Sequence, residues 1–182
     1  MPPEQTRSAD ELTVNRFAAG DVANTLRERG WLAGEPSPEH LAWCARSAAI
    51  LGGHVADRKG LEDLLRLIFH YDPREILSRV EAHVVLSRSA ARDVLRQLAL
   101  SLLDGVPLTS ERFNEIIDAL KQNLDVRGRE LFHPIRLALA GRAGEGELDR
   151  VILLLDEAAA LQFTTPVKSA RERILEFCAA LD

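Results

Sequence analysis

Residues 126–142 read VRGRELFHPIRLALAGR, and this stretch with its continuation carries the clearest structural pattern of the chain. Pro134 fits the first turn of a helix, where its missing N–H is not needed, and Gly141 fits the position just after a helix end. Small residues follow at 143–146, and the aliphatic run at 151–155 predicts another helix over about 147–162. The stretch therefore predicts two helices joined by a glycine-rich turn.

Helix signals of the same kind continue outward in both directions, whereas alternating strand patterns are nearly absent. A capping residue precedes proline at Ser37-Pro38 and again at Asp72-Pro73, which is typical of helix starts. The expected helices, besides the two above, cover about 8–30 (opened by a capping box at Ser8–Glu11), 37–51, 60–70, 72–86, Ser87 or Ser89 to Gly105, 109–120 (opened by Thr109-Ser110-Glu111) and 165–181 (capped by Thr165-Pro166).

We therefore expect an all-α fold, an irregular multi-helix bundle or cage of about nine or ten helices. No sequence repeat of fixed period supports a regular solenoid. A mild boundary at Tyr71-Asp72-Pro73 predicts two packed helical lobes, residues 1–72 and 73–182.

The composition fits a cytoplasmic domain built on aliphatic residues. Of the 182 residues, 46% are hydrophobic but only 5% are aromatic. No apolar run reaches the length of a transmembrane helix, and the first residues lack the apolar stretch of a signal peptide. Cys44 and Cys178 are far apart in sequence and each lies in an apolar context, so we expect two buried free thiols.

The chain is acidic, with a net charge of −5 and a pI of about 5.6. This argues mildly against strong non-specific binding to nucleic acid, which depends on neutralising phosphates. Three lysines among 23 Lys+Arg leave 20 arginines. Arginine clamps phosphates well, but a genomic composition effect is the favoured explanation of such a bias.

The segment 126–142 resembles the C-terminal, anticodon-binding region of bacterial glutamyl-tRNA synthetases. That family carries a run similar to Leu-Lys-Gly-Lys-x-Leu-Phe-x-Pro-Leu-Arg-Val-Ala-Leu-Thr-Gly, followed by a small-residue loop and an apolar helix. A weaker similarity covers 55–69, ahead of Asp72-Pro73, so the resemblance extends from about residue 13 to 161. It implies a helical cage and tRNA as the partner.

The adenylate chemistry of the family needs two signatures that these 182 residues do not show. One is a His-x-Gly-His segment, and the other is a Lys-Met-Ser-Lys-Ser type loop. Met1 is the only methionine, and Lys59, Lys121 and Lys168 are far apart. We therefore expect no catalytic residues, no cofactor and no enzyme activity, but a stand-alone tRNA-binding module that supplies tRNA to a separate synthetase-like catalytic protein.

The resemblance places the anticodon beside the loop that begins at Gly141, so Gly141, Arg142, Gly144 and Gly146 are candidate RNA-binding residues. Glycines let a backbone approach a base, and Arg142 has the chemistry to stack on a base or hold a phosphate. The alternative is a flexible turn without a binding role. Glu145 and Glu147, which repel phosphate, favour that alternative.

Arg127, Arg129 and Arg136 match basic positions of the family pattern and are further candidates for RNA contact. The alternatives are a structural ion pair for Arg136, for example with Glu130, and a solvated charged turn for the other two. His54 stands where the family usually has an arginine that reads an anticodon base. His54 has a ring to stack on a base, or it is a loop histidine without an RNA partner.

No metal site is expected, because His40 and Cys44, one helical turn apart, supply only two ligands. The leading hypothesis is weak, salt-sensitive tRNA binding. The main alternative is a helical protein–protein interaction or regulatory domain that has lost RNA binding, favoured by the acidic charge and the missing arginine. A third possibility is that the sequence is part of a full synthetase.

Overall fold

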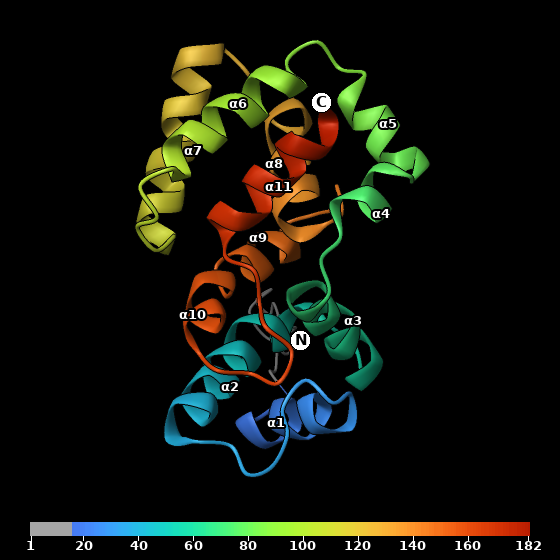
Figure 1. Ribbon diagram of the computed structural model, residues 1–182, viewed down its shortest axis with the longest axis vertical. Helices are drawn as coiled ribbons and strands as arrows, with labels where there is room; N and C mark the ends of the chain where they lie inside the picture. Colours follow the sequence, from blue (N-terminus) through green and yellow to red (C-terminus); the bar gives the residue numbers. More distant parts are fainter. Residues whose placement is uncertain (1–15) are drawn as a thin grey trace, which may run out of the picture.

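The structure, a computed structural model, describes residues 16–182 and consists of helices joined by short connections (Figure 1). About 68% of it is helical, and the described residues contain no strand, so the predicted all-α fold is confirmed. The elements are α1 (Ala19–Glu28), α2 (Pro38–Leu51), the 3-10 helix η2 (Gly52–His54), α3 (Arg58–Phe69), α4 (Pro73–Leu77), α5 (Val80–Leu86), α6 (Ala91–Leu102), α7 (Ser110–Leu124), α8 (Arg129–Ala140), α9 (Glu147–Ile152), α10 (Leu155–Ala160) and α11 (Ala170–Leu181).

Side-chain caps determine where several helices begin. In each case a side-chain oxygen accepts a hydrogen bond from a backbone N–H of the first turn, which has no partner inside the helix. The caps predicted for α2, α4 and α7 are confirmed. The capping residues are Ser37, Asp57, Asp72, Thr109 and Ser169.

Two expected helices are each divided into two short ones. The helix predicted over 72–86 is α4 and α5, separated at Ser78 and Arg79, and the one predicted over 147–162 is α9 and α10. Ser78 Oγ donates to the Glu75 carbonyl at 2.7 Å, and this side-chain hydrogen bond competes with the backbone hydrogen bonds of the helix for that carbonyl. The Trp43 indole donates to the Leu154 carbonyl at the second break, 3.3 Å away.

Several predicted helix starts are wrong. Helix α6 begins at Ala91 without a serine cap, and Ser169 rather than Thr165 caps α11. Pro134 lies inside α8, not in its first turn, because Gly128, with φ of 57°, already begins the helix at Arg129. In the N-terminal helix, the capping box at Ser8–Glu11 lies outside the described residues, and α1 starts only at Ala19.

The helices gather at two ends of an elongated molecule (Figure 1). One end holds α1, α2 and α3 together with α10 and the segment 161–169, and the other holds α4 to α8 with α11. The first group joins distant parts of the chain: Ala33 N–H bonds to Thr164 Oγ1 at 2.8 Å, and Arg46 pairs with Glu157 at 2.8 Å. A division of the chain at residue 72 stays a prediction.

Arg173 and Tyr71 join the two ends. The Arg173 side chain is fully buried and donates to the carbonyls of Leu67 and Ile68 in the last turn of α3 and of Leu139 in the last turn of α8. The Tyr71 hydroxyl donates to Ala138, and the Arg173 guanidinium lies 4.6 Å from the Tyr71 ring centroid. One cation therefore satisfies carbonyls at two helix C-termini, whose dipoles carry partial negative charge.

The core is mainly aliphatic, as expected, with a small aromatic group near the α2–α10 contact. Phe163 packs edge-to-face on Trp43 and Phe69, and Trp31 stacks on Phe69 with ring centroids 4.9 Å apart. Cys44 is buried as predicted, but Cys178 is only half-buried. Within residues 16–182, every helix is too short or too polar to cross a membrane.

Candidate nucleic-acid interface

The loop that follows α8 is held in shape by Arg136. Its Nε and Nη2 donate to the two carboxylate oxygens of Asp149 at 2.8 and 2.9 Å, and Nη1 donates to the Gly144 carbonyl at 3.0 Å. The side chain is only 11% exposed, and its guanidinium lies 4.8 Å from the Phe132 ring centroid. Arg136 thus makes a structural ion pair, with Asp149 in place of the expected Glu130.

Two hollows flank this loop. The α4-side hollow has a volume of about 250 Å³ and lies against α3 and α4; Gly141 and Arg142 line it with Asp63, Arg66, His70, Asp72, Glu75 and Arg79. The α7-side hollow has a volume of about 360 Å³; it is lined by His54, Ser110, Phe113, Asn114, Gly146, Asp149, Arg150 and Leu153. The structure therefore brings together His54 and Gly146, which are distant in sequence.

Each hollow has on its wall one exposed arginine outside any ion pair of the described residues; Arg66, also exposed in the α4-side hollow, pairs with Glu62. Arg142 and Arg150 are both exposed, and neither forms an ion pair within the described part of the chain. Glu145 is also exposed and Glu147 half-buried, so the loop carries both signs of charge. The two arginines are the groups of this loop best placed to meet phosphate or to stack on a base.

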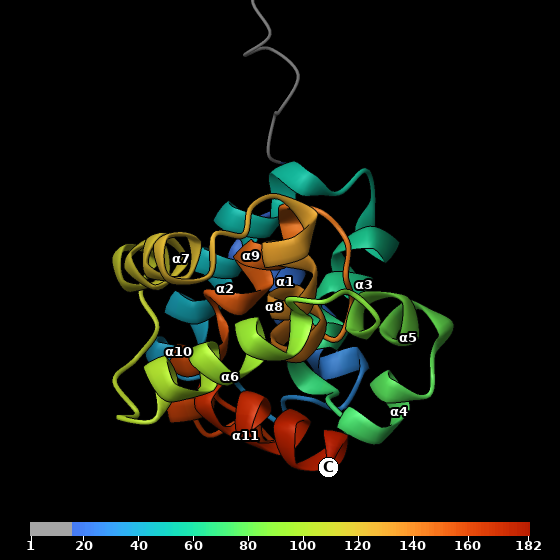
Figure 2. The same ribbon diagram turned by 90° about the horizontal axis from the view of Figure 1, so that it is seen from above.

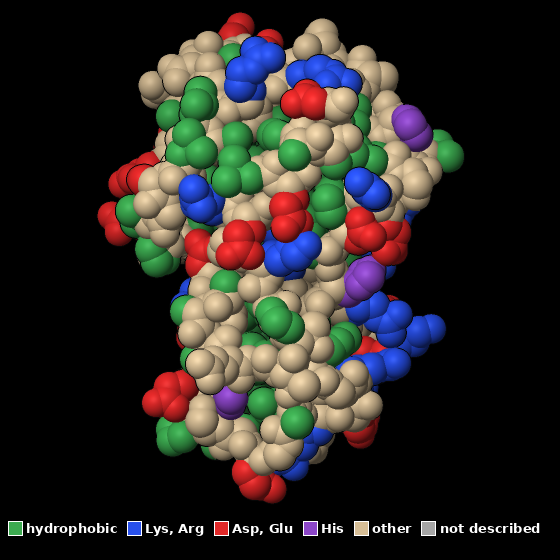
Figure 3. Space-filling view, viewed as in Figure 1, with side chains coloured by type: hydrophobic (Ala, Val, Ile, Leu, Met, Phe, Trp, Pro, Cys, Tyr) green, Lys and Arg blue, Asp and Glu red, His purple; other side chains and the backbone are tan. Residues whose placement is uncertain are grey.

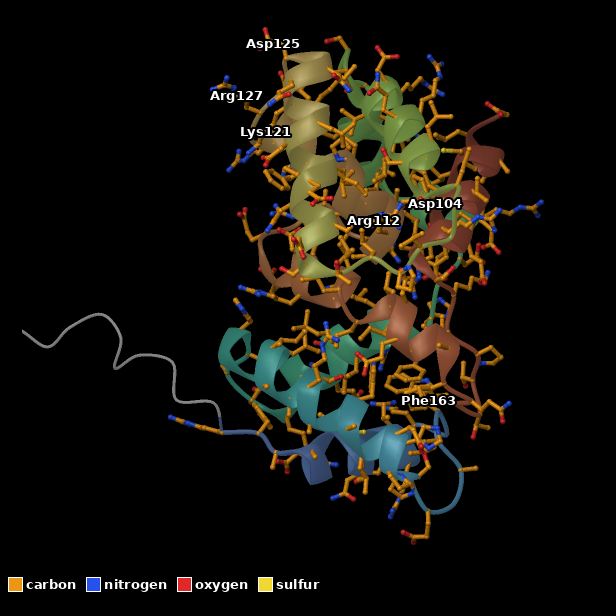
Figure 4. The ribbon with its side chains drawn as sticks, turned by 90° about the vertical axis from the view of Figure 1, so that its left-hand side faces the viewer. Asp104, Arg112, Lys121, Asp125, Arg127 and Phe163 are labelled. Atoms are coloured by element: carbon orange, nitrogen blue, oxygen red, sulfur yellow. The ribbon has the colours of Figure 1, made fainter. Side chains whose placement is uncertain are left out.

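The turn between α7 and α8 holds a second basic group. Asp125 and Gly128 both have positive φ, 50° and 57°, and they turn the chain so that Arg127 and Arg129 are exposed. Figure 4 shows Lys121 and Arg127 on the same edge of the molecule, beyond α7. Lys121 Nζ lies 5.9 Å from the centroid of the half-buried Phe132 ring.

Arg88 links this turn to α8. Its Nη1 donates to His133 Nδ1 at 3.0 Å and to the Arg129 carbonyl at 3.3 Å. Burial lowers the pKa of His133, and the nearby Arg88, Arg129 and Arg136 charges lower it further. His133 is therefore an uncharged hydrogen-bond acceptor at neutral pH, and the positive charge of this region comes from arginine and lysine.

The predicted candidates occupy two places on the molecule. One is the α7–α8 turn with Arg127 and Arg129, and the other is the loop after α8, where His54 of η2 lines the α7-side hollow together with Gly146. Figure 2 shows that the loop and α9 lie on the side opposite α11. Sequence reasoning missed Asn114, Arg150 and Arg88. The position of Arg150, one helical turn after Gly146, offered a signal; Asn114 and Arg88 reach their places only through tertiary packing.

The described residues include no cluster of three or more His, Cys, Asp or Glu side chains suited to a metal ion. Both nitrogens of His40 have partners: Nδ1 accepts from the Ser37 N–H at 3.2 Å, and Nε2 lies 3.0 Å from the Gln162 carbonyl. The ring therefore acts as a cap and as a link to the segment after α10.

Comparison with known proteins gives a consistent result. A sequence profile of the family described as "Anticodon binding domain" matches residues 22–162. The chain is 28% identical over 116 residues to a glutamate–tRNA ligase of Lactobacillus gasseri, and the aligned region covers 63% of this chain and 22% of the ligase. For the ligase of Bacillus subtilis the identity is 26% over 137 residues, covering 75% and 28% of the two chains.

The ligase of Desulforudis audaxviator is 30% identical over 143 residues, with 75% of this chain and 28% of the ligase covered. The chain thus spans only about a quarter of the length of these relatives. No solved structure matches the chain significantly.

Proposed function

The chain belongs to the family of anticodon-binding domains related to glutamyl-tRNA synthetases, and from this premise we propose that it binds the anticodon arm of a tRNA through the loop 141–149 and the two hollows beside it. The observation that carries the proposal is the loop itself. It falls inside the matched range, it is fixed by the Arg136–Asp149 pair, and it exposes Arg142, with Arg150 exposed on α9 directly after it.

The geometry fits recognition of an unpaired loop better than recognition of a duplex. Single-stranded bases can be turned out into small hollows, where stacking groups and backbone atoms read their edges. The α7-side hollow offers the His54 ring and the Asn114 amide, together with the Gly146 backbone. A glycine there leaves room for a base, since nothing lies within 4 Å of the position a Cβ would take.

We also propose that these 182 residues carry out no adenylate chemistry. Amino-acid activation would then be performed by catalytic residues outside them, such as those of a separate synthetase-like protein in the cytoplasm. This part rests on the absence of both ATP-phosphate signatures from the sequence. Glutamate-dependent pyrophosphate exchange by the pure protein would contradict it.

The test of RNA binding is fluorescence anisotropy with total tRNA and with a labelled anticodon-arm hairpin, at rising salt. We expect Arg142→Ala and Arg150→Ala each to weaken binding by about 1–3 kcal/mol, the scale of a lost base stack or charged contact. Because both side chains are exposed, their removal should change stability by no more than about 0.5 kcal/mol.

Arg74→Ala is the matched control, because Arg74 is also exposed but lines a different hollow, with Glu176 of α11, and neither of the two hollows beside the loop. It should leave the affinity unchanged. Undetectable binding at low salt, or equal affinities for all three variants and the unchanged protein, would contradict the proposal. The protein-interaction alternative would then be the better account.

A further inference from the structure

A strip of basic side chains follows one face of α8, from the α7–α8 turn toward the loop after α8. Arg129, His133 and Arg136 occupy positions i, i+4 and i+7 of this helix, so they share that face. Arg136 is paired with Asp149, whereas Arg129 is exposed and forms no ion pair within residues 16–182. Glu130 follows Arg129 directly, but it lies about a quarter turn round the helix from this face.

Arg88 reaches the strip from the link between α5 and α6. Its Nη1 donates to His133 Nδ1 at 3.0 Å and to the Arg129 carbonyl at 3.3 Å, and these bonds hold the guanidinium against the first turn of α8. Its Nε and Nη2 have no hydrogen-bond partner in the part of the chain that the structure describes. That edge of the guanidinium is therefore available to a ligand that accepts two parallel hydrogen bonds, as phosphate does.

The charges around His133 are mainly positive. Burial lowers the pKa of His133 most, and Arg88, Arg129 and Arg136 then lower it further. Glu145, on the loop after α8, acts in the opposite direction and is the weakest of these influences. Arg88 and Arg129 thus lie close together without a carboxylate partner among the described residues, and a bound anion would remove their mutual repulsion.

The strip belongs to the side of the molecule that carries the proposed RNA-binding loop. Figure 4 shows Lys121 and Arg127 at the edge away from α11, and Figure 2 shows the loop after α8 on that same side. The opposite face, over α6 and α11, carries hydrophobic side chains with Asp and Glu beside Lys and Arg (Figure 3). Phosphates suit the first face better, because binding them depends on cations that carboxylates do not already neutralise.

The length of α8 sets the spacing between this strip and the loop. From Arg129 to Gly141 the helix extends about 18 Å, at 1.5 Å per residue. A stacked nucleic-acid strand advances about 3.4 Å per phosphate, so this length corresponds to about five nucleotides. An RNA whose unpaired bases enter the hollows beside the loop would therefore bring another part of its arm to the start of α8.

We propose that Arg88 and Arg129 together bind one phosphate of the RNA arm, about five nucleotides from the bases that enter the hollows. The inference rests on the proposed function and adds a second contact at a defined spacing from the first. Arg88 supplies the edge formed by Nε and Nη2, and Arg129 supplies an exposed guanidinium beside it. Such a contact positions the RNA without reading its sequence.

The salt dependence of binding tests whether a phosphate is held there. In fluorescence anisotropy of the full chain with an anticodon-arm hairpin, Arg88→Ala and Arg129→Ala should each weaken binding by about three- to tenfold. The double variant should flatten the slope of log affinity against log salt by about 0.7–0.9, the contribution of one phosphate. Arg96→Ala is the control, because Arg96 is exposed in the groove between α6 and α11, and it should change neither quantity.

A single-stranded RNA with the loop sequence alone separates this contact from the hollows. Arg142→Ala should weaken the binding of this short RNA, whereas Arg88→Ala should not. The imidazole of His133 gives a readout that a purely structural role of Arg88 would not move. Its pKa, followed by NMR and assigned with His133→Gln, should rise when the hairpin binds, because a phosphate beside the ring favours the charged form.

The outcomes distinguish this inference from the proposed function. Hairpin binding that depends on Arg142 but keeps its affinity and salt slope in both Arg88→Ala and Arg129→Ala would overturn the phosphate site and leave the proposed function intact. An unchanged pKa of His133 in the bound state would also overturn the site. A slope lowered by two phosphates in the double variant would overturn the shared contact. Binding that depends on Arg88 and Arg129 but not on Arg142 would support the site and overturn the loop as the main contact.

Discussion

Replacing Arg173 by methionine tests how a buried cation without a carboxylate partner stabilises this fold. Its four hydrogen bonds go to the carbonyls of Leu67, Ile68, Leu139 and Lys168, at 2.6–3.1 Å. Burial lowers the pKa of Arg173 to about 10, so the side chain stays protonated at neutral pH. Methionine fills a similar volume but donates nothing.

Two opposing terms set the expected size of the effect. Four carbonyls lose a donor, and each buried acceptor left unsatisfied costs about 1–3 kcal/mol, which gives about 8 kcal/mol at the centre of the range. Removing the guanidinium relieves the net cost of its buried charge, desolvation less the attraction of nearby groups such as Glu176, which the fall in pKa from 12.5 to about 10 puts at about 3 kcal/mol. The first term is larger, so Arg173→Met should destabilise the protein by about 5 kcal/mol, or about 10–20 °C in Tm.

Urea and thermal unfolding of the protein, followed by circular dichroism, give the measurement. Arg173→Lys should be intermediate, because an ammonium group keeps the charge but cannot reach all four carbonyls. Arg171→Met is the control: Arg171 is exposed and makes one hydrogen bond, to Leu103, so we expect a loss within about 1 kcal/mol. Equal stabilities of the Arg173→Met and Arg171→Met variants would refute the reasoning.

Two further predictions concern α8. The folded-state pKa of His133 is lowered below 6.5, so the unfolded chain binds the proton more readily; the stability from this group is present above pH 6.5 and lost as pH falls. Stability measured between about pH 7 and 5 should therefore fall less in His133→Gln than in the unchanged protein, and equal falls would contradict this. Gly141→Ala should lower the free energy of unfolding, measured by urea titration, by about 1 kcal/mol, because φ is 81° at Gly141. Gly146→Ala should leave the free energy of unfolding nearly unchanged, because φ is −63° there. Equal losses for the two variants would contradict this prediction.

The helical class and several helix starts could be predicted because their causes are local. A serine, threonine or aspartate beside the first turn supplies an acceptor whatever the rest of the fold does, and the caps at Ser37, Asp72 and Thr109 are examples. Gly141 likewise ends α8 because its positive φ is a property of the single residue.

The helix breaks could not be predicted because a tertiary contact contributes to each of them, beside the local Ser78–Glu75 bond at the first. The Leu154 carbonyl at the α9–α10 break receives the indole of Trp43, more than a hundred residues away in sequence. At the α4–α5 break, the Arg79 guanidinium reaches the Gly141 carbonyl at 2.9 Å. The prediction from Pro134 was wrong for a different reason. Proline has no N–H to donate to the carbonyl four residues earlier, that of Glu130. Because Glu130 is exposed, the helix tolerates the proline in its interior.

The candidate site divides in the same way. Sequence similarity identified the loop 141–147 and the arginines around it, but it could not distinguish an arginine that binds from one that supports. Arg136 supports the loop because Asp149, thirteen residues later, returns to face it. Arg142 remains exposed because α4 leaves an open hollow beside it.

The charge available on this face limits how the protein can hold RNA. Around the loop and the α7–α8 turn, the exposed arginines without an ion pair among the described residues are Arg127, Arg129, Arg142 and Arg150. Four phosphate contacts would give a slope of log affinity against log salt of about −3, at about 0.7 per contact for single strands. A shallower slope, with Arg142→Ala still weakening binding, would mean that the hollows rather than the phosphates supply most of the affinity. A slope much steeper than about −3 would require cations outside this face, and the loop could not then be the main contact.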